Sequence, residues 1–544
     1  MKNLILVFAV LFLFQSAFAQ TVKEKKLFEG KDIETYSLYD FRFDEKSGTY
    51  VYSKSDTITY KTKLISNKGN SDEYNNIGSY YAQFDNSGNY YVSGSNTLAN
   101  NANQYFFLRN GVKLKTFENI NEPISKNGNN IYFVARENGK DFLVVYNTVS
   151  GEFQYGNKYD TINYVYIKNT GYAEGEPMYE LGFTKNGEPY YHACKDGKQM
   201  IVVGSTEMKK YDEVQYYNVI QDKNGTVCYS AKNVVGGKNE YCFVQGEKEY
   251  RKFTSVNMPV VFDASNVPVY SASDTPEDYP MDQFVVKGND IVSKRFSRGV
   301  YDIFITPSGK TAYNGTDTLA DGSFVNTLIV DGKEIARYTS IFEIKFKSND
   351  QPVFVASNPA NESFVVDGSK QVSDKYGYIY DLEIRPDGSL SYTGVNYGNY
   401  EQKIPDKYYF VNGKKKFGPF NDIMMTEMLG DQVVFNENGE FAYVGSVMTP
   451  GKEYELTKFY VVSNGWKTDK YDGITELHSH GENFFYVASN YYDDGRSTNQ
   501  LFINDEKLGN EYELISNLNL NKEKNVITFN GIKKNKIYLV TVSL

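Results

Sequence analysis

The chain has 544 residues, of which 40% are hydrophobic and 23% charged, as in soluble globular proteins, and it is too long for one ordinary hydrophobic core. Its net charge of −10, with no basic stripe, argues against nucleic acids and anionic lipid surfaces as partners. Aromatic residues make up 16% of the chain and include 49 tyrosines, which favours pleated sheets over helices.

Residues 1–19 have the features of a secretory signal peptide. Lys2 supplies the positive start, residues 4–14 form the apolar core, and Ala17-Phe18-Ala19 forms a small-x-small cleavage site. The apolar core is too short to span a bilayer, and no cysteine follows it as in a lipid-anchored protein. The ending Phe-Ala-Gln resembles signal peptides that are common in Bacteroidetes. We therefore expect an exported protein, periplasmic or extracellular, with no transmembrane segment after cleavage.

A repeat occupies the chain after residue 38. Its first mark is an aromatic residue followed three positions later by a β-branched one, as in Tyr338 and Ile341; at Phe296 the partner position is Gly299. Successive aromatics lie 38 to 52 residues apart. The aromatic members are Tyr74, Phe117, Tyr159, Tyr211, Phe253, Phe296, Tyr338, Tyr376, Phe420, Tyr471 and Tyr512.

The second mark is a turn residue, usually glycine, with an aromatic four positions later and a small residue at the sixth. Gly309, Tyr313 and Gly315 form one example. Residues 329–358 show the full unit, in which short alternating strands are separated by tight turns. Four such strands make a small antiparallel sheet that must stack on similar neighbours to bury its faces.

Two segments of this repeat resemble those of bacterial TolB-type, WD-repeat-like β-propellers: PDGSLSYTG (386–394) and VNGKKKFGPFNDI (411–423). The resemblance covers nearly the whole mature chain and implies an all-β fold of four-stranded blades. The Gly-His and Trp-Asp dipeptides of true WD repeats are missing from the sequence. Because TolB-type proteins have many roles, the resemblance implies a fold rather than a function.

The two ends of the chain together complete a twelfth repeat. Residues 20–38 look like a last strand without its sheet, and the segment after Ile515 supplies three strands. We expect these C-terminal strands to pair with residues 20–38, which would remove exposed edges. Twelve blades exceed the four to eight of one propeller. We therefore predict two propellers of about six blades, at 20–257 and 258–544; one large ring and a seven-plus-five division are the alternatives.

If the strands of a blade are named a to d, the longer, variable connections all fall on one side. These are the b–c connections at 271–282, 315–326, 394–406 and 489–499 and a d–a insertion at 163–180. Variable loops on a rigid scaffold commonly carry binding sites, although exposure to water alone would also make them polar. The candidate binding residues are Tyr279, Asp282, Asp321, Tyr397, Tyr400, Tyr491, Tyr492, Asp493 and Asp494.

Metal-binding and cysteine chemistry have weaker signals. Glu476, His478 and His480 alternate along one predicted strand, a spacing compatible with a transition metal; a polar strand end is the plainer interpretation. Acidic pairs in the loops could hold calcium, but no cofactor is predicted. Cys228 and Cys242 flank a predicted hairpin, so they form either a cross-strand disulfide or two small buried residues.

The sequence favours a non-catalytic exported propeller that binds a protein or glycan of the cell envelope through its loop-rich side. It has no nucleophile elbow, P-loop or dinucleotide fingerprint, and we assign no catalytic residue. A hydrolase or lyase acting on polysaccharide, with acids from the b–c loops, is the first alternative. An outer-membrane β-barrel is the second, because acidic chains rich in tyrosine and asparagine also occur there.

Overall fold

The structure is a computed structural model that describes residues 22–29, 41–44, 46–56, 58–167, 178–275, 282–399, 404, 406–420, 422–423, 433–447, 458–463, 466–492, 496–534 and 536–544. Nearly all regular structure in these ranges is β-strand, with one 3₁₀ turn, η2 (Tyr216–Asn218). The chain divides into two compact units, Ser37–Lys375 (the larger unit) and Met1–Tyr36 with Tyr376–Leu544 (the smaller unit).

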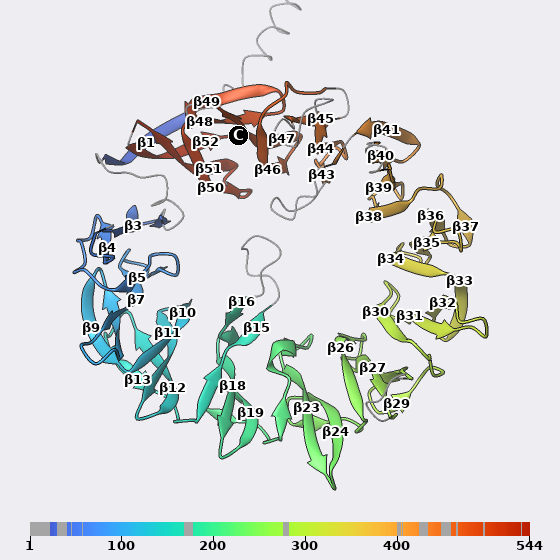
Figure 1. Cartoon of the computed structure of the whole chain (residues 1–544), viewed down its shortest axis with the longest axis horizontal. Helices are drawn as coiled ribbons and strands as arrows, with labels where there is room; N and C mark the ends of the chain where they lie inside the picture. Colours follow the sequence, from blue (N-terminus) through green and yellow to red (C-terminus); the bar gives the residue numbers. More distant parts are fainter. Residues whose placement is uncertain are drawn as a thin grey trace, which may run out of the picture. The chain divides into compact units, whose positions relative to one another are not determined.

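The first half of the larger unit contains five sheets and a separate two-stranded ribbon (Figure 1). Its strands are β2 (Arg42–Asp44), β3 (Thr49–Ser55), β4 (Thr62–Ser66), β5 (Asn76–Ile77), β6 (Gln83–Phe84), β7 (Tyr90–Thr97), β8 (Asn103–Arg109), β9 (Val112–Phe117), β10 (Asn119–Asn127), β11 (Asn130–Glu137), β12 (Lys140–Asn147), β13 (Phe153–Tyr155), β14 (Thr161–Asn163), β15 (Val165–Ile167), β16 (Met178–Glu180), β17 (Gly182–Phe183), β18 (Pro189–Lys195), β19 (Lys198–Val203), β20 (Thr206–Glu207), β21 (Glu213–Val214), β22 (Ile220–Gln221), β23 (Val227–Val235), β24 (Lys238–Gln245) and β25 (Lys248–Glu249).

The second half of the larger unit contains three four-stranded sheets. Its strands are β26 (Ser255–Phe262), β27 (Pro268–Ser273), β28 (Phe284–Lys287), β29 (Asp290–Ile291), β30 (Gly299–Ile305), β31 (Thr311–Thr318), β32 (Phe324–Val330), β33 (Lys333–Tyr338), β34 (Ser340–Phe346), β35 (Pro352–Ser357), β36 (Ser363–Asp367) and β37 (Lys370–Gln371).

The smaller unit contains four sheets of four described strands each. Its strands are β1 (Val22–Glu29), β38 (Tyr378–Ile384), β39 (Leu390–Asn396), β40 (Lys407–Asn412), β41 (Lys415–Phe420), β42 (Asp422–Ile423), β43 (Val433–Phe435), β44 (Phe441–Val447), β45 (Lys458–Ser463), β46 (Gly473–His480), β47 (Asn483–Tyr491), β48 (Ser497–Ile503), β49 (Glu506–Tyr512), β50 (Leu514–Asn521), β51 (Val526–Lys533) and β52 (Lys536–Ser543).

Neighbouring strands pair antiparallel in the described sheets, and most sheets follow the order a-b-c-d along the chain, as in β30-β31-β32-β33. Tight turns at positive φ make this possible, as at Gly309 (φ +88°) and Gly388 (φ +79°), where an L-residue would be strained. The first strand is irregular: it is split into two pieces in sheets such as β5/β6 on β7, and it carries a bulge in others, including β30 and β34. The prediction of an all-β, β-propeller fold of about twelve repeats is confirmed: the described strands form twelve such sheets in addition to the β15–β16 ribbon.

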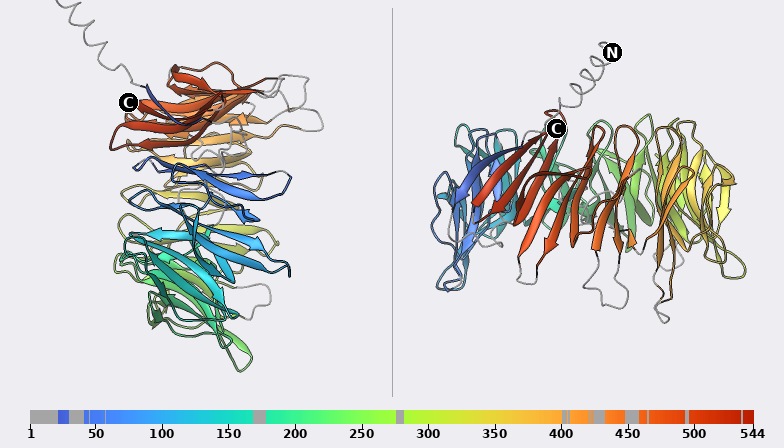
Figure 2. Two further views of the ribbon diagram at one scale, coloured as in Figure 1. Left: turned by 90° about the vertical axis from the view of Figure 1, so that its left-hand side faces the viewer. Right: turned by 90° about the horizontal axis from the view of Figure 1, so that it is seen from above.

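One sheet of the smaller unit combines strands from opposite ends of the sequence. β1 pairs antiparallel with β52, from Val22 opposite Val542 to Glu29 opposite Lys536, and the order is β1-β52-β51-β50. In Figures 1 and 2 the blue β1 lies alongside the red C-terminal strands. Glu24 fixes the added strand, because its Oε1 accepts hydrogen bonds from Asn510 Nδ2 at 2.7 Å and from the Tyr512 hydroxyl.

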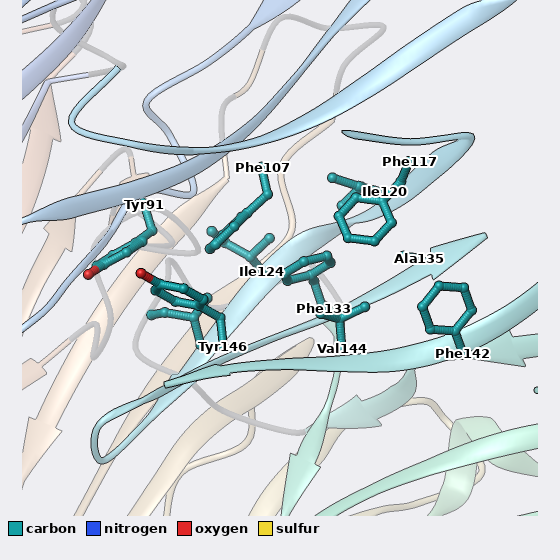
Figure 3. Packing of buried hydrophobic residues seen from close by; sticks show 11 residues of the cluster. Tyr91, Phe107, Phe117, Ile120, Ile124, Phe133, Ala135, Phe142, Val144 and Tyr146 are labelled. Atoms are coloured by element: carbon teal, nitrogen blue, oxygen red, sulfur yellow. The ribbon is translucent and has the colours of Figure 1, made fainter. Parts of the chain in front are cut away.

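The core lies between the faces of consecutive sheets. Figure 3 shows one such layer, in which Tyr91 and Phe107 of one sheet pack against Ile124, Phe133 and Tyr146 of the next. The centroids of the Phe107 and Phe133 rings are 4.8 Å apart. Such a layer buries the facing sides of two neighbouring sheets, which a four-stranded sheet cannot do alone.

The predicted boundary between residues 257 and 258 lies inside the larger unit. Apolar residues on its two sides share one core: Phe243 and Val256 pack with Val260 and Tyr270. The division into two propellers at this position, and the number of rings, stay predictions. Within the described ranges, no helix is long and apolar enough to cross a membrane. The predicted signal peptide, 1–19, lies outside the described residues.

Candidate binding face

The residue that follows the aromatic of the first mark fixes the b–c end of the sheet. Its side chain accepts a backbone hydrogen bond near the end of strand b: Asp212 Oδ2 from Val234 N at 2.8 Å, and Asp472 Oδ2 from Tyr491 N at 3.0 Å. The same arrangement occurs at Asn75, Glu118, Asp160, Ser297 and Glu513. Sequence analysis missed these residues, although their fixed position beside the aromatic was a usable signal.

Lysines at the start of strand c reinforce three of these carboxylates. Lys198 Nζ lies 2.5 Å from Asp212 Oδ1, and Lys140 and Lys458 pair in the same way with Asp160 and Asp472. The hydrogen bond from Lys198 lowers the pKa of Asp212, and that from Lys140 lowers the pKa of Asp160. Each of these three carboxylates therefore joins strand b of its own sheet to the start of strand c in the preceding sheet, which stiffens this side of the unit.

Three of the predicted binding tyrosines lie on this side of the smaller unit, and all are exposed. Tyr397, at the end of β39, is 64% exposed, whereas Tyr491 and Tyr492, at the end of β47, are 63% and 47% exposed. The Tyr492 hydroxyl lies 3.4 Å from Thr498 Oγ1. An exposed tyrosine ring offers an apolar face and a polar hydroxyl edge, which suits it to contacts with a ligand.

Two of these tyrosine rings lie beside glycines, whose missing side chains leave room for them. A Cβ on Gly377 would lie 2.6 Å from Cδ2 of Tyr397, so the ring occupies the space that a side chain at this position would fill. Tyr491 lies over Gly473 in a looser contact, with its hydroxyl 3.4 Å from the position of such a Cβ. Both glycines fall in the segment just after the aromatic of the first mark.

The larger unit contains a similar arrangement that sequence analysis did not assign to binding. Tyr301 is 54% exposed, donates its hydroxyl to Arg298 O at 3.0 Å, and has its Cζ 3.6 Å from the Cβ position of Gly299. Nearby, the Arg298 guanidinium lies 4.3 Å from the ring centre of Phe324. Gly299, which interrupts the first mark, is favoured here for two reasons. Its φ is +116°, and a Cβ at this position would lie 3.2 Å from Gln283 Oε1.

The predicted acidic residues have mainly local partners. Asp321 Oδ1 accepts hydrogen bonds from Ser323 Oγ at 2.6 Å and Ser323 N at 3.0 Å, and these lower the pKa of Asp321. Asp282 lies near Arg295, whose guanidinium binds both carboxylate oxygens of Asp274, at 2.6 and 2.9 Å. Tyr279, Tyr400, Asp493 and Asp494 lie outside the described residues.

The region predicted as a connection at 315–326 is shorter in the structure. β31 continues to Thr318 and β32 begins at Phe324, so only residues 319–323 form the turn and Asp321 lies at its tip. The b–c connections at 394–406 and 489–499 are shortened in the same way, because their flanking strands extend to Asn396 and from Ser497. The b–c side thus combines short hairpins with longer connections, such as residues 397–406 between β39 and β40 and residues 274–283 between β27 and β28.

The three residues of the predicted metal site do not come together. A bulge between Thr475 and His478, with Glu476 at φ +59°, interrupts the expected alternation. His478 Nε2 lies 3.1 Å from Glu476 Oε2, whereas His480 Nε2 lies 2.6 Å from Asn525 Oδ1. Over the ranges that the structure describes, no three His, Cys, Asp or Glu side chains group as potential metal ligands.

Acidic residues also occupy the bulge of the first strand in several sheets. They are Asp302 and Glu343 in the larger unit and Asp381 and Glu476 in the smaller unit, each at a φ of +51° to +59°. Bulges of this kind re-aim side chains and are frequent beside active sites. Burial raises the pKa of Asp302. Sequence analysis did not predict the bulges, because a bulge is a backbone feature without a residue signature of its own.

His192, Cys228 and Cys242 are buried, and Cys194 is partly exposed. His192 Nδ1 lies 3.0 Å from Asn163 Nδ2, which donates to it, and Nε2 lies 3.1 Å from Gln199 Oε1; burial lowers the pKa of this imidazole. All three cysteines are free. Cys228 pairs with Gln245 and Cys242 with Ala231, so the two thiols lie on opposite faces of their sheet and cannot form the disulfide considered above.

No protein-family model matches the sequence, and no curated protein matches it. Solved structures that it resembles include TolB from Acinetobacter baumannii, at 10% identity over 60% of this chain and 80% of that one, with a TM-score of 0.20. The β-propeller domain of the Trilobed protease from Pyrococcus furiosus matches at 13% identity over 66% and 98%, with a TM-score of 0.23. An oligogalacturonate lyase in complex with manganese matches at 12% over 62% and 96%, with a TM-score of 0.27. Likeness at this level carries no argument about activity or ligand.

Proposed function

We propose that this protein is an exported, non-catalytic β-propeller of the cell envelope that binds a protein or glycan through the b–c side of its sheets. The observation that carries the proposal is the set of exposed tyrosines on rigid supports: Tyr397 and Tyr491 protrude from strand ends that a packed core and the Asp472 hydrogen bond hold in place. A preformed aromatic surface binds with little loss of conformational entropy.

A binding screen on residues 20–544 against envelope glycans and solubilised envelope proteins tests this proposal. We expect saturable binding without product, and loss of binding when 394–406 and 489–499 are replaced by two-residue turns. A matched control replaces the tight c–d turn at Asp331-Gly332 with Asn-Gly, at the opposite end of its sheet, and should bind like the native protein. Binding that survives the loop replacements would contradict the proposal.

A polysaccharide hydrolase or lyase is the second candidate, and the acidic residues at first-strand bulges are the observation that favours it. This candidate predicts turnover of a bound glycan that is lost in Asp302→Asn or Glu343→Gln while binding is kept. Release of reducing ends or unsaturated products by the native protein, and not by these variants, would replace the non-catalytic proposal.

A further inference from the structure

The glycine-supported tyrosines of the smaller unit indicate the class of ligand, on the premise that the b–c side binds as proposed above. The Tyr397 ring takes the place of a side chain at Gly377, and the Tyr491 ring lies over Gly473. The Tyr397 ring thus fills the side-chain space of Gly377, and the hydroxyl edge of Tyr491 lies near Gly473, while more than 60% of each tyrosine stays open to solvent. Such a ring offers a flat apolar surface with a polar hydroxyl at its edge.

The two rings belong to sheets that have one sheet between them. Tyr397 follows β39 in the β38–β41 sheet, Tyr491 ends β47 in the β46–β49 sheet, and the β42–β45 sheet packs against both. Sheets that pack face to face lie about 10 Å apart, so the rings are separated by roughly 20 Å. A ligand that uses both must be an extended chain with a repeated flat apolar surface.

The net charge of the chain opposes an anionic ligand. Asp406 lies next to Tyr397, where its Oδ1 accepts a hydrogen bond from Gly398 N at 2.7 Å, whereas Lys458 balances the charge of Asp472 beside Tyr491. The whole chain carries a net charge of −10. A polyanion such as a polyuronate would therefore approach against an unfavourable potential.

We propose that Tyr397 and Tyr491 are two stacking subsites for one neutral polysaccharide, whose pyranose rings place their apolar C–H faces on the tyrosine rings. A neutral polysaccharide is extended, repeats its apolar face along the chain, and has hydroxyls that suit the polar edge of each ring. Because both subsites act on one chain, they reinforce each other only for ligands long enough to reach both.

The glycines allow a test that moves one ring without removing it. Neither glycine has a left-handed φ, so alanine is compatible with both backbone conformations, although the Gly377 methyl would also lie 3.2 Å from Val395 O. In Gly377→Ala the new methyl group would overlap the exposed Tyr397 ring and displace it, whereas in Gly473→Ala it would lie at ordinary contact distance from Tyr491. The second variant is therefore a matched control for the first.

Affinity electrophoresis and calorimetry on residues 20–544 would use mixed-linkage β-glucan, xyloglucan and soluble starch as neutral probes, with polygalacturonate and a proline-rich peptide for comparison. We expect one or more neutral polymers to bind, with about tenfold weaker binding in Tyr397→Ala, Tyr491→Ala and Gly377→Ala. Tyr397→Phe and Gly473→Ala should bind within about threefold of the native protein, and a disaccharide of the same linkage should bind far more weakly than the polymer.

The results separate the two proposals. Neutral-polymer binding that is unaffected by the tyrosine and Gly377 substitutions, but lost with the 394–406 and 489–499 replacements, would overturn the stacking subsites and leave the binding face intact. The same holds if only polygalacturonate or the peptide binds. Binding that survives both loop replacements would overturn the binding face and the subsites together. Circular dichroism of each variant would confirm that the fold is unchanged.

Discussion

At the residue scale, residues of the two sequence marks pack against each other within one repeat. The aromatic of the first mark packs on the small residue of the second in the same repeat: a Cβ on Gly315 would lie 2.3 Å from the Phe296 ring, and one on Gly531 would lie 2.5 Å from the Tyr512 ring. Phe296 also meets the aromatic of the second mark, Tyr313, edge to face at 6.1 Å. The two marks recur at a nearly constant spacing from each other because their residues are in contact in the folded repeat.

Replacing Gly315 by alanine tests this contact. We expect a loss of about 1–3 kcal/mol in the free energy of unfolding, because the buried Phe296 ring cannot move aside, and recovery of part of the loss in Gly315→Ala/Phe296→Leu. Gly78→Ala, where no atom lies within 4 Å and φ is not left-handed, should be neutral or slightly stabilising. Urea unfolding midpoints measure both, and equal effects at the two glycines would contradict the explanation.

The cysteines show what residue spacing alone could not decide. The hairpin around residue 235 was readable from the sequence, but its register was not, and a shift of one residue moves a side chain to the other face. In the observed register Cys228 and Cys242 face different neighbouring sheets. Burial raises the pKa of the Cys242 thiol to about 12, so its reactive thiolate is scarce at neutral pH.

We therefore expect Cys228 and Cys242 to resist alkylation in the native protein and to react fully in denaturant. Mass spectrometry of protein treated with iodoacetamide, without reductant, would count the labelled thiols under each condition. Cys194, which is partly exposed, is the internal comparison. A mass two units lower in the unreduced denatured protein, with both cysteines unlabelled, would show a disulfide and contradict the observed register.

At the element scale, buried aspartates build several a–b turns. Asp222 Oδ1 accepts hydrogen bonds from Asn224 N and Thr226 N, both at 2.8 Å, and Oδ2 accepts from Gln245 Nε2 at 2.6 Å. Asn266 of the next sheet donates to the same Oδ2 at 2.8 Å. One carboxylate therefore shapes its own turn and joins it to a neighbour, as Asp350 does by accepting from Ser308 N at 2.9 Å.

The turn at Asp222 predicts a pH dependence of stability. Burial alone would raise the pKa of Asp222, but the hydrogen bonds from Gln245, Asn266 and the turn backbone outweigh it and lower the pKa overall. A lowered native pKa means that the carboxylate stabilises the fold above its unfolded pKa of about 3.9, and that this contribution is lost as the pH falls through the native value.

Asp222→Asn should therefore reduce the free energy of unfolding at pH 7 by about 1–3 kcal/mol and by less at pH 3. Urea unfolding at the two pH values gives the comparison, and the exposed Asp290→Asn serves as the control that should change little at either pH. A loss at pH 3 as large as that at pH 7 would show that the charge of Asp222 does not contribute.

The sequence predicted the elements well and their ends less well. Glycines mark the turns because they adopt positive φ without strain, and alternating apolar residues mark the strands because successive side chains point to opposite faces of a sheet. The pairs that lengthen β31 and β32 across the predicted connection at 315–326 include Thr316 with Asn326 and Asp317 with Val325, and the polar residues of β31 here carry no alternation signal. The bulge that separates Glu476 from its expected partners is likewise a backbone property, and the candidate tyrosines could be named but not their glycine supports.

At the scale of the whole molecule, the pairing of β1 with β52 ties residues 22–29 to the C-terminal strands. Without β1 the backbone groups of β52 would lie at an open edge, which favours association between molecules. We expect a protein beginning at residue 31 to unfold at least about 5 °C lower than one beginning at residue 20, and to aggregate sooner. Differential scanning calorimetry with light scattering compares the two, and equal midpoints would mean that β1 adds no stability.

The proposed binding surface is the b–c side of the sheets. Hydrogen–deuterium exchange of residues 20–544, with and without a saturating amount of the polysaccharide or envelope protein that binds best, measures this directly. We predict protection at the ends of β39 and β47 and around Tyr397 and Tyr491, with no change at the a–b turns near Gly225, Gly309 and Gly388. Protection confined to those turns would contradict the account and place the binding surface on the opposite side of the sheets.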